Sequence, residues 1–331
     1  MALERIAVIG AGAWGTALAA ILARAGRDVV LWARRPELSD KINADHLSPD
    51  FLPGIDLPPS LRATSDLSAA CEGQEAVLLV VPSTYVRDLC SRMAGNLPGR
   101  VPIILCAKGI EADSGALMAD IAGEELPGHP VGVLTGPTFA GEVARGLPTA
   151  ITLALPGADT HAVATAIRTP AFRPYLSDDL VGVQIGGAVK NVIAIASGIA
   201  TGLDLGSNAR AALVTRGLAE IARLAVARGA RAETLMGLSG LGDLSLTCSS
   251  PQSRNMAFGI GLGEGSSMAD LLSGRRSVVE GVENAQTVTA AARALGVELP
   301  ICEAVNAVLH HGVDIRSAIR GLLDRPLRTE L

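Results

Sequence analysis

The chain has 331 residues, of which 49% are apolar and only 2% aromatic, and its formal net charge is −5 at pH 7. This length allows two domains with a large core, which Ala, Leu, Val and Ile must fill. So few aromatic rings disfavour binding of single-stranded nucleic acid, which needs stacking platforms, and the absence of a basic run disfavours a polyanionic partner.

Five cysteines, an odd number without a C-x-x-C pair, are typical of a reducing cytoplasm and argue against a metal cluster. The first residues lack the basic and apolar regions of a signal peptide. We therefore expect a soluble cytoplasmic protein without a resident metal.

The chain begins with the pattern of a dinucleotide-binding unit. Apolar runs predict strands over residues 5–10 and 28–33, and a helix-forming run lies between them. The turn into that helix carries Gly10, Gly12 and Gly15 in a G-x-G-x-x-G pattern. Such glycines permit a tight turn and let backbone N–H groups approach a pyrophosphate at the helix N-terminus. The alternative is an ordinary glycine-rich turn between a strand and a helix.

Two arginines follow the second predicted strand, at the position where NAD enzymes carry a ribose-binding carboxylate. Arg34 and Arg35 suit the 2′-phosphate of NADP, although a solvated basic loop would show the same residues. Beyond them, residues 36–66 predict a short helix and then a long irregular segment.

Five further strands are predicted, and helical stretches separate most of them: residues 76–81, 102–107, 131–135, 149–155 and 172–176. This alternation predicts a doubly wound, mostly parallel sheet, in which ligands lie at the carboxyl ends of the strands. Lys108 and the turn 136–140 occupy such ends. Thr138 in that turn could instead cap the next helix.

The alternation of strands and helices stops near residue 180. We therefore predict a Rossmann-like dinucleotide-binding domain in residues 1–180 and an all-α domain in residues 181–331. In the second part, a helix over 212–230 carries Arg216, Glu220 and Arg223, which can pair at helical spacing.

The most informative stretch is a nearly continuous apolar run over residues 181–205 that contains Lys190 and Asn191 near its middle. Its glycines and polar residues favour a buried core helix over a membrane span. On a helical wheel, small and polar side chains surround Lys190: Gly186, Ala194, Ser197 and Thr201. This face leaves room for a ligand beside the amine, which indicates a proton donor or an electrostatic anchor. The alternative is a lysine whose stem packs while its head reaches water.

Three other features suggest ligand contacts. A glycine-rich loop ends at Asp243, which shares a helical face with Thr247 four residues later. Arg254 follows in a Ser-Arg-Asn sequence, and arginine suits bidentate contact with phosphate. The five histidines fall in predicted loops or helix ends, so Lys190 is the best candidate for a proton donor. Residues 277–284 are uninformative by themselves.

Together these segments resemble the bacterial NAD(P)-dependent glycerol-3-phosphate dehydrogenases. The resemblance runs over nearly the whole chain, in family order: VIGAGAWGTALA, FLPGIDLP, VVPS, AKGIE, GPTFAGE, GLPTAI, GVQIGGAVKNVIAIASGI, LMGLSGLGDLSLTC, SRN and VVEG. Residues 322–331 match no motif. The resemblance implies interconversion of dihydroxyacetone phosphate and sn-glycerol 3-phosphate with NADP or NAD, for glycerophospholipid synthesis, in a homodimer.

The resemblance also implies roles for individual residues. Lys190 is implied as the proton donor and acceptor, with Lys108 stabilising the developing alkoxide and Asp243 holding the amine charged. The implied substrate contacts are Lys108, Gly136, Thr138, Lys190, Asn191, Asp243, Thr247, Ser253, Arg254 and Asn255. The implied cofactor contacts, besides the three glycines, are Ala13, Trp14, Arg34, Arg35, Lys108, Ala140, Arg254, Val278 and Glu280.

Two alternative functions remain open. A β-hydroxyacid dehydrogenase shares the two-domain plan, but it carries Asn four residues after its lysine, where this chain has Ala194, with Asn191 adjacent instead. A non-catalytic dinucleotide sensor would not need a proton donor, which the set of Lys190, Asp243 and Arg254 offers.

Overall fold

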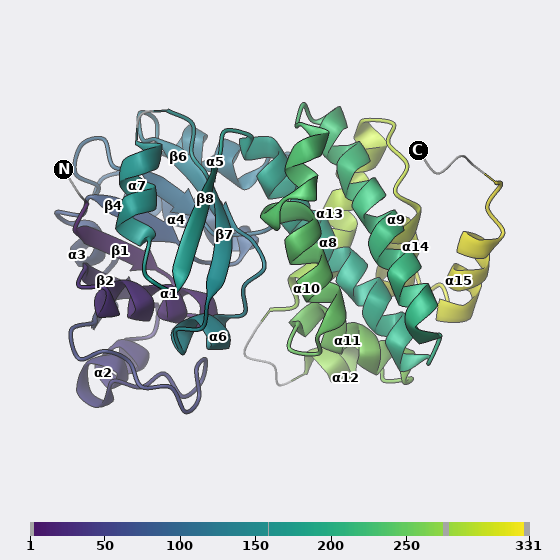
Figure 1. Ribbon diagram of the computed structural model, residues 1–331, viewed down its shortest axis with the longest axis horizontal. Coiled ribbons are helices and arrows are strands. Elements are labelled where there is room, and N and C mark those ends of the chain that lie inside the picture. Colours follow the sequence, from purple (N-terminus) through teal and green to yellow (C-terminus); the bar gives the residue numbers. More distant parts are fainter. Residues whose placement is uncertain (1–2, 158, 274–277, 328–331) are drawn as a thin grey trace.

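The computed structural model describes residues 3–157, 159–273 and 278–327. A sheet covered by helices forms the first half of the chain, and a helical assembly forms the second (Figure 1). The predicted architecture, a mostly parallel sheet followed by an all-helical region, is confirmed. Of the stretches discussed above, Ser277 and residues 328–331 lie outside the described ranges.

Within the described residues, eight strands form one sheet in the order β3-β2-β1-β4-β5-β6-β7-β8. Neighbouring strands are parallel except β6 and β7, which are antiparallel. The strands are β1 Arg5–Ile9, β2 Asp28–Trp32, β3 Arg62–Thr64, β4 Ala76–Leu79, β5 Ile103–Leu105, β6 Val131–Thr135, β7 Thr149–Ala154 and β8 Phe172–Ser177. All predicted strands are present, and β3 is an additional one in the segment read as irregular.

The two faces of the sheet pack against different helices, as β1 illustrates. Ile6 and Val8 belong to a core shared with α1, α6 and α7, whereas Ala7 and Ile9 belong to a core shared with α3, α4 and α5. This split follows from the two-residue period of a strand. The helices are α1 Ala13–Arg24, α2 Pro36–Asp45, α3 Leu67–Cys71, η1 Ser83–Tyr85, α4 Val86–Met93, α5 Met118–Glu125, α6 Ala140–Ala144 and α7 Thr160–Ile167.

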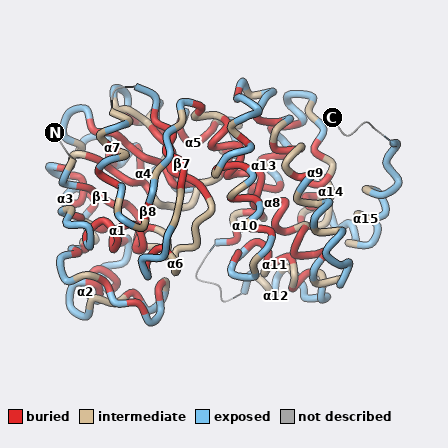
Figure 2. Tube along the Cα trace, viewed as in Figure 1, coloured by how far each residue is buried: buried red, intermediate tan, exposed pale blue. Residues whose placement is uncertain are grey.

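The second half is built around α8, Leu180–Gly202, which contacts α9, α10, α11 and α13 and lies buried among them (Figure 2). Its length and composition would allow it to cross a membrane, but 89% of its most apolar window is buried inside the protein. The prediction of a buried core helix is therefore confirmed. The remaining helices are α9 Gly206–Ala227, η2 Ala232–Met236, η3 Leu238–Gly242, α10 Asp243–Ser249, α11 Arg254–Gly263, α12 Met268–Leu272, α13 Glu280–Ala294, α14 Pro300–His310 and α15 Ile315–Leu323.

Glycines bring the backbones of α8 and α11 into contact. A Cβ atom on Gly198 would lie 2.2 Å from the carbonyl oxygen of Met256, and one on Gly259 would lie 2.2 Å from that of Ile195. Real Cβ atoms do not approach so closely, so the two helices can adopt this spacing only with glycine at both positions. The start of α11 is thereby held close to the middle of α8.

In α9, Glu220 has a different partner from the arginines expected at helical spacing. Its buried carboxylate accepts hydrogen bonds from the backbone N–H groups of Ile301 at 2.7 Å and Cys302 at 3.2 Å. Arg223 donates to the carbonyl oxygen of Glu298 at 3.1 Å. Glu220 therefore satisfies the first turn of α14, which leaves N–H groups without partners inside the helix.

Candidate active site

The glycine turn after β1 has the shape of a dinucleotide cradle. Gly10 has a φ of +120°, and a Cβ atom on Gly15 would lie 1.8 Å from the carbonyl oxygen of Gly10. By contrast, no atom lies within 4 Å of a Cβ built on Gly12, which precedes α1. The first and third glycines thus close the turn, while the second leaves space in front of the N–H groups of α1. This space and these donors fit a pyrophosphate.

Two lysines share one carboxylate where α8, the start of α10 and the loop after β5 meet. Asp243 Oδ1 lies 2.5 Å from Lys190 Nζ, and Asp243 Oδ2 lies 2.8 Å from Lys108 Nζ. Thr247 Oγ1 lies 2.8 Å from Lys190 Nζ and donates to the Asp243 carbonyl oxygen at 2.6 Å. The side chain of Asp243 is 2% exposed and that of Lys190 is 7% exposed. Four predicted residues therefore meet at one point, although they come from three separate segments.

The shared carboxylate affects the two amines differently. Burial lowers the pKa of Lys190 to about 8, and the charge of Lys108 adds to this effect while Asp243 opposes it. Burial also lowers the pKa of Lys108, but the attraction of Asp243 outweighs it and the net pKa is raised. Burial raises the pKa of Asp243, but the two lysines outweigh it and leave the net pKa lowered. Lys190 is thus the first of the three groups to change charge as the pH rises above neutral.

The small face of α8 lets other segments close on Lys190 rather than leaving that side open. A Cβ atom on Gly186 would lie 2.5 Å from the carbonyl oxygen of Ser239 in η3. Since η3 leads directly into α10, this close approach places Asp243 beside Lys190. The space beside the amine that the sequence indicated is therefore taken in part by the segment that carries its counter-ion.

A chain of amide hydrogen bonds links α8, α11 and α13. The N–H of Gly281 donates to Asn255 Oδ1 at 2.9 Å, Asn255 Nδ2 donates to Asn191 Oδ1 at 2.9 Å, and Asn191 Nδ2 donates to Glu280 Oε2 at 3.2 Å. A backbone N–H can only donate, so its position sets the orientation of both amides. Each Nδ2 keeps one further hydrogen for another acceptor.

Ser253 and Arg254 lie at the start of α11. Ser253 is buried and caps the helix, since its side chain accepts from the N–H of Met256 at 3.3 Å. Arg254 is exposed and has no hydrogen bond or ion pair within the part of the chain that the structure describes. Its guanidinium can therefore bind an anion without first giving up a protein partner.

The turn after β6 adjoins the lysine cluster. Thr135, the last residue of β6, lies with its Oγ1 3.5 Å from Asp243 Oδ2, and Gly136 follows it. Thr138 donates to the Gly136 carbonyl oxygen at 3.3 Å, and no side chain caps α6. The capping role considered for Thr138 is therefore wrong, and α6 begins at Ala140.

The two arginines after β2 differ in their contacts. Arg35 forms an exposed ion pair with Asp50 at 3.0 Å, and its guanidinium carbon lies 5.9 Å from the Phe51 ring centre. The guanidinium carbon of Arg34 lies 6.0 Å from the Tyr85 ring centre. Two aromatic–arginine pairs therefore border this corner of the sheet.

Other residues implied at the cofactor lie on both halves of the chain. Ala13 and Trp14 begin α1, and the Trp14 ring centre lies 6.4 Å from that of Phe172. Val278 is 38% exposed, and Glu280 begins α13.

Three residues were not predicted although they contact the lysine cluster. Thr135 reaches Asp243, Asn284 donates to the carbonyl oxygen of Lys108, and Gly187 faces the stem of Lys108. Thr135 ends β6 directly after the buried residues Val133 and Leu134, which was a usable signal. The sequence around Asn284 and Gly187 contains no comparable signal.

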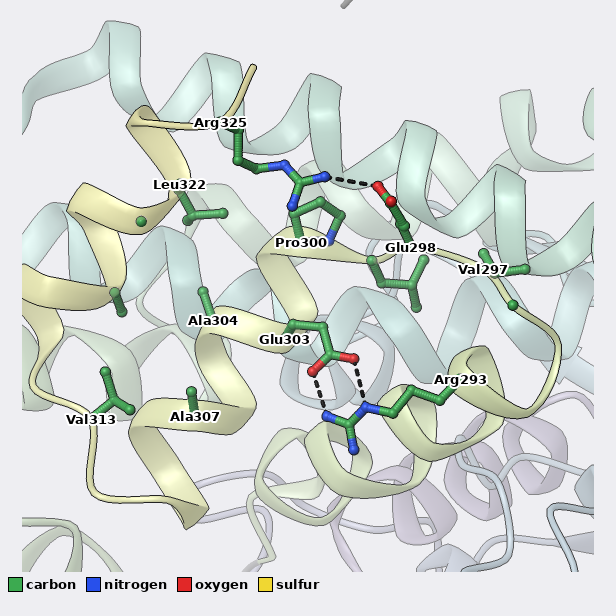
Figure 3. A pocket seen from close by; sticks show the side chains of 14 residues that line it. Arg293, Val297, Glu298, Pro300, Glu303, Ala304, Ala307, Val313, Leu322 and Arg325 are labelled. Atoms are coloured by element: carbon green, nitrogen blue, oxygen red, sulfur yellow. Dashed lines mark hydrogen bonds and ion pairs between the residues drawn. The ribbon is translucent and has the colours of Figure 1, made fainter. Parts of the chain in front are cut away.

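A separate groove of about 670 Å³ lies between α15 on one side and α14, with the segment that joins it to α13, on the other (Figure 3). None of its lining residues belongs to the predicted site. Its cations are paired with its own carboxylates, since Arg293 binds Glu303 and Arg325 binds Glu298. This groove is therefore separate from the lysine cluster.

Comparison with known proteins identifies relatives of the whole chain. Two family models match, described as the N-terminus and the C-terminus of NAD-dependent glycerol-3-phosphate dehydrogenase, over residues 5–161 and 179–320. Glycerol-3-phosphate dehydrogenase [NAD(P)+] of Rhodospirillum rubrum is 56% identical over 329 residues, covering 99% of this chain and 94% of the relative. The corresponding protein of Caulobacter vibrioides is 54% identical and is covered along its whole length.

Solved structures give the same result. The crystal structure of glycerol-3-phosphate dehydrogenase from Coxiella burnetii is 41% identical and superposes with a TM-score of 0.94, covering 98% of this chain and 99% of that one. A ketopantoate reductase from Ralstonia eutropha is only 22% identical, with a TM-score of 0.63 and coverage of 96% and 99%. This second likeness concerns the fold alone.

Proposed function

Since the chain belongs to the family of NAD(P)-dependent glycerol-3-phosphate dehydrogenases, we propose that Lys190 is the proton donor and acceptor of its reaction. The observation that carries the proposal is the burial of Lys190 at 2.5 Å from Asp243, with a pKa lowered to about 8. A general acid works best when its pKa lies near the working pH.

The proposed substrate pair is dihydroxyacetone phosphate and sn-glycerol 3-phosphate. When bound, the nicotinamide supplies or accepts the hydride at the substrate carbon. As the carbonyl oxygen gains negative charge, Lys190 donates a proton to it, and the reverse reaction returns the hydroxyl proton to the neutral amine. When Lys190 donates its proton, the net charge of Lys190, Lys108 and Asp243 changes from +1 to 0. Lys108 remains charged beside the oxygen and stabilises the developing alkoxide.

For the phosphate end of the substrate, we assign Arg254 as the main contact. It lies exposed and without a protein partner among the described residues, next to Asn255. The remaining Nδ2 hydrogens of Asn255 and Asn191 are further donors for the phosphate. Ser253, Gly136, Thr138 and Thr247 complete the proposed substrate contacts. Binding energy from this remote end orients the ketone for reaction.

For the cofactor, we propose contacts from both halves of the chain, and we propose that NADPH is used at least as well as NADH. The glycine turn holds the pyrophosphate, and Arg34 and Arg35 hold the 2′-phosphate. The other proposed contacts are Ala13, Trp14, Lys108, Ala140, Arg254, Val278 and Glu280.

We also propose that residues 1–180 and 181–331 are the two domains, and that the active protein is a cytoplasmic homodimer. Its product would then supply glycerophospholipid synthesis. The alternative of a β-hydroxyacid dehydrogenase is weakened by Ala194, four residues after Lys190, and a sensor would not need the buried lysine.

The test is substitution of the lysine. Lys190→Met should lower kcat for dihydroxyacetone phosphate reduction by roughly 10²–10⁴-fold, because a positioned general acid contributes about this much. NADPH binding, followed by fluorescence, should change little. Lys41→Met is a matched control, since Lys41 is an exposed lysine paired with Asp45 at 2.7 Å. Near-normal turnover of Lys190→Met would exclude Lys190 as the proton donor.

A further inference from the structure

Asn284 connects three parts of the site that are far apart in the sequence. It lies on α13 with 2% exposure, and its Nδ2 donates to the carbonyl oxygens of Lys108 at 3.1 Å and Ala188 at 3.0 Å. Both acceptors are backbone carbonyls, so the orientation of the amide is determined and both of its hydrogens are used. One acceptor belongs to Lys108 itself, and the other lies two residues before Lys190 on α8.

The stem of Lys108 is held from a second direction. A Cβ atom on Gly187 would lie 3.3 Å from Lys108 Cγ and 3.4 Å from Thr135 Oγ1. The lysine stem therefore crosses α8 where the helix has no side chain. Lys108 is therefore restrained in three places: its backbone carbonyl by Asn284, its stem by Gly187 and its amine by Asp243.

We propose that Asn284 is a positioning residue that keeps Lys108 on Asp243, and so determines how strongly that carboxylate acts on Lys190. Asn284 itself touches neither lysine side chain through its hydrogen bonds, so it acts through the backbone of Lys108. The consequence for turnover rests on the proposed role of Lys190 as proton donor, whereas the consequence for the charge of Lys190 does not.

The direction of the effect follows from the titratable groups around Lys190. Asp243 and Cys248 face it from α10, and Lys108 faces it from the loop after β5. Glu280 on α13 acts on Lys108. If Lys108 moves away from Asp243, Lys190 loses a repelling cation and gains the undivided attraction of the carboxylate. The pKa of Lys190 should then rise.

Kinetics as a function of pH test the proposal. In Asn284→Ala, kcat/KM for dihydroxyacetone phosphate should fall by about tenfold because Lys108 is misplaced. The high-pH limb of the profile of kcat/KM against pH should move to higher pH by about half to one unit. A full opposite charge at this range shifts a pKa by about 1–3 units, and here the charge is only redistributed. Gly187→Ala disturbs Lys108 at its stem rather than at its backbone, and it should shift the limb in the same direction. It decides the question if Asn284→Ala does not fold.

A control on the same helix separates positioning from general destabilisation. Thr289 is fully buried on α13 and donates only within its own helix, to the carbonyl oxygen of Ala285 at 2.8 Å. Thr289→Val removes a buried polar group without touching Lys108, so the limb should stay in place. Asn284→Ser, which keeps one donor, should recover part of the lost rate.

Direct titration provides a readout that does not depend on catalysis. The chain contains only three lysines, Lys41, Lys108 and Lys190, so lysine-selective NMR gives few signals to assign. The Lys190 signal should titrate at higher pH in Asn284→Ala and in Gly187→Ala than in the unchanged chain. Unmoved titration and an unmoved limb in both variants would overturn the proposal. A moved titration together with an active Lys190→Met would support it while rejecting Lys190 as the proton donor.

Discussion

Asp243 is the group whose removal should change the pH dependence of the reaction most. Asp243→Asn removes the negative charge that lies 2.5 Å from Lys190 and 2.8 Å from Lys108. An opposite charge at this range shifts a pKa by about 1–3 units. Without it, both the burial of Lys190 and the repulsion from Lys108 lower the pKa of Lys190 further from its value of about 8.

The expected magnitude follows from the protonated fraction of Lys190. With a pKa of about 8, about three quarters of the amine is charged at pH 7.5. A loss of about 1–3 units lowers the reduction rate at that pH by roughly three- to a few hundredfold. The oxidation of glycerol 3-phosphate needs the neutral amine, so it should lose much less at pH 9. The pH profile of kcat/KM in both directions, from pH 5.5 to 10, measures these effects.

A second buried carboxylate provides the control. Asp179 caps α8, where it accepts from the N–H groups of Gly182 at 2.8 Å and Arg231 at 2.9 Å. Asp179→Asn should lower the stability, measured by thermal unfolding, without moving the kinetic pKa values. If Asp243→Asn leaves the high-pH limb of reduction in place, or if Asp179→Asn moves it equally, the shared-carboxylate explanation of the Lys190 pKa is refuted.

Two further predictions concern phosphate groups. Arg254→Ala should cost about 2–5 kcal/mol in kcat/KM for dihydroxyacetone phosphate and much less for dihydroxyacetone, and equal losses on both would contradict phosphate binding. Changing Arg34 and Arg35 together to Ala should raise the Kd for NADPH roughly tenfold at low salt, because exposed charge-assisted contacts are lost, and leave the Kd for NADH nearly unchanged. Titration of both coenzymes decides this, and a tenfold preference of the unchanged chain for NADH would contradict it.

The sheet could be predicted from the sequence because its strands are short apolar runs that end in glycine, proline or polar residues. The strand β3 was missed because its three residues, Arg62–Thr64, carry neither an apolar run nor an alternating pattern. It forms because β2 has an edge free to pair with it. The N–H of Ala33, just after β2, donates to the carbonyl oxygen of Thr64 at 2.9 Å. Pairing with an existing strand, rather than local preference, makes this segment a strand.

The arrangement of the site was harder to predict from the sequence than the identity of its residues. The helical face of Lys190 and the spacing of Asp243 and Thr247 were visible, since both depend on local periodicity. The sequence did not predict that Lys108 and Lys190 bind the same carboxylate, because 135 and 53 residues separate them from Asp243. This shared contact depends on how the sheet and the helices meet.

The spacing between the proposed proton donor and the proposed phosphate contacts is set mainly by backbone contacts. Gly198 and Gly259 bring α8 and α11 together, and the amide of Asn255 at the start of α11 then reaches Asn191 at 2.9 Å. Lys190 precedes Asn191 and Arg254 precedes Asn255. The same contact between the helices therefore fixes the distance between the backbones of Lys190 and Arg254. A substrate that carries its ketone and its phosphate on one short carbon chain needs such a fixed distance. Long side chains between α8 and α11 would let the spacing of the two helices vary with their rotamers. Helices in backbone contact keep one spacing.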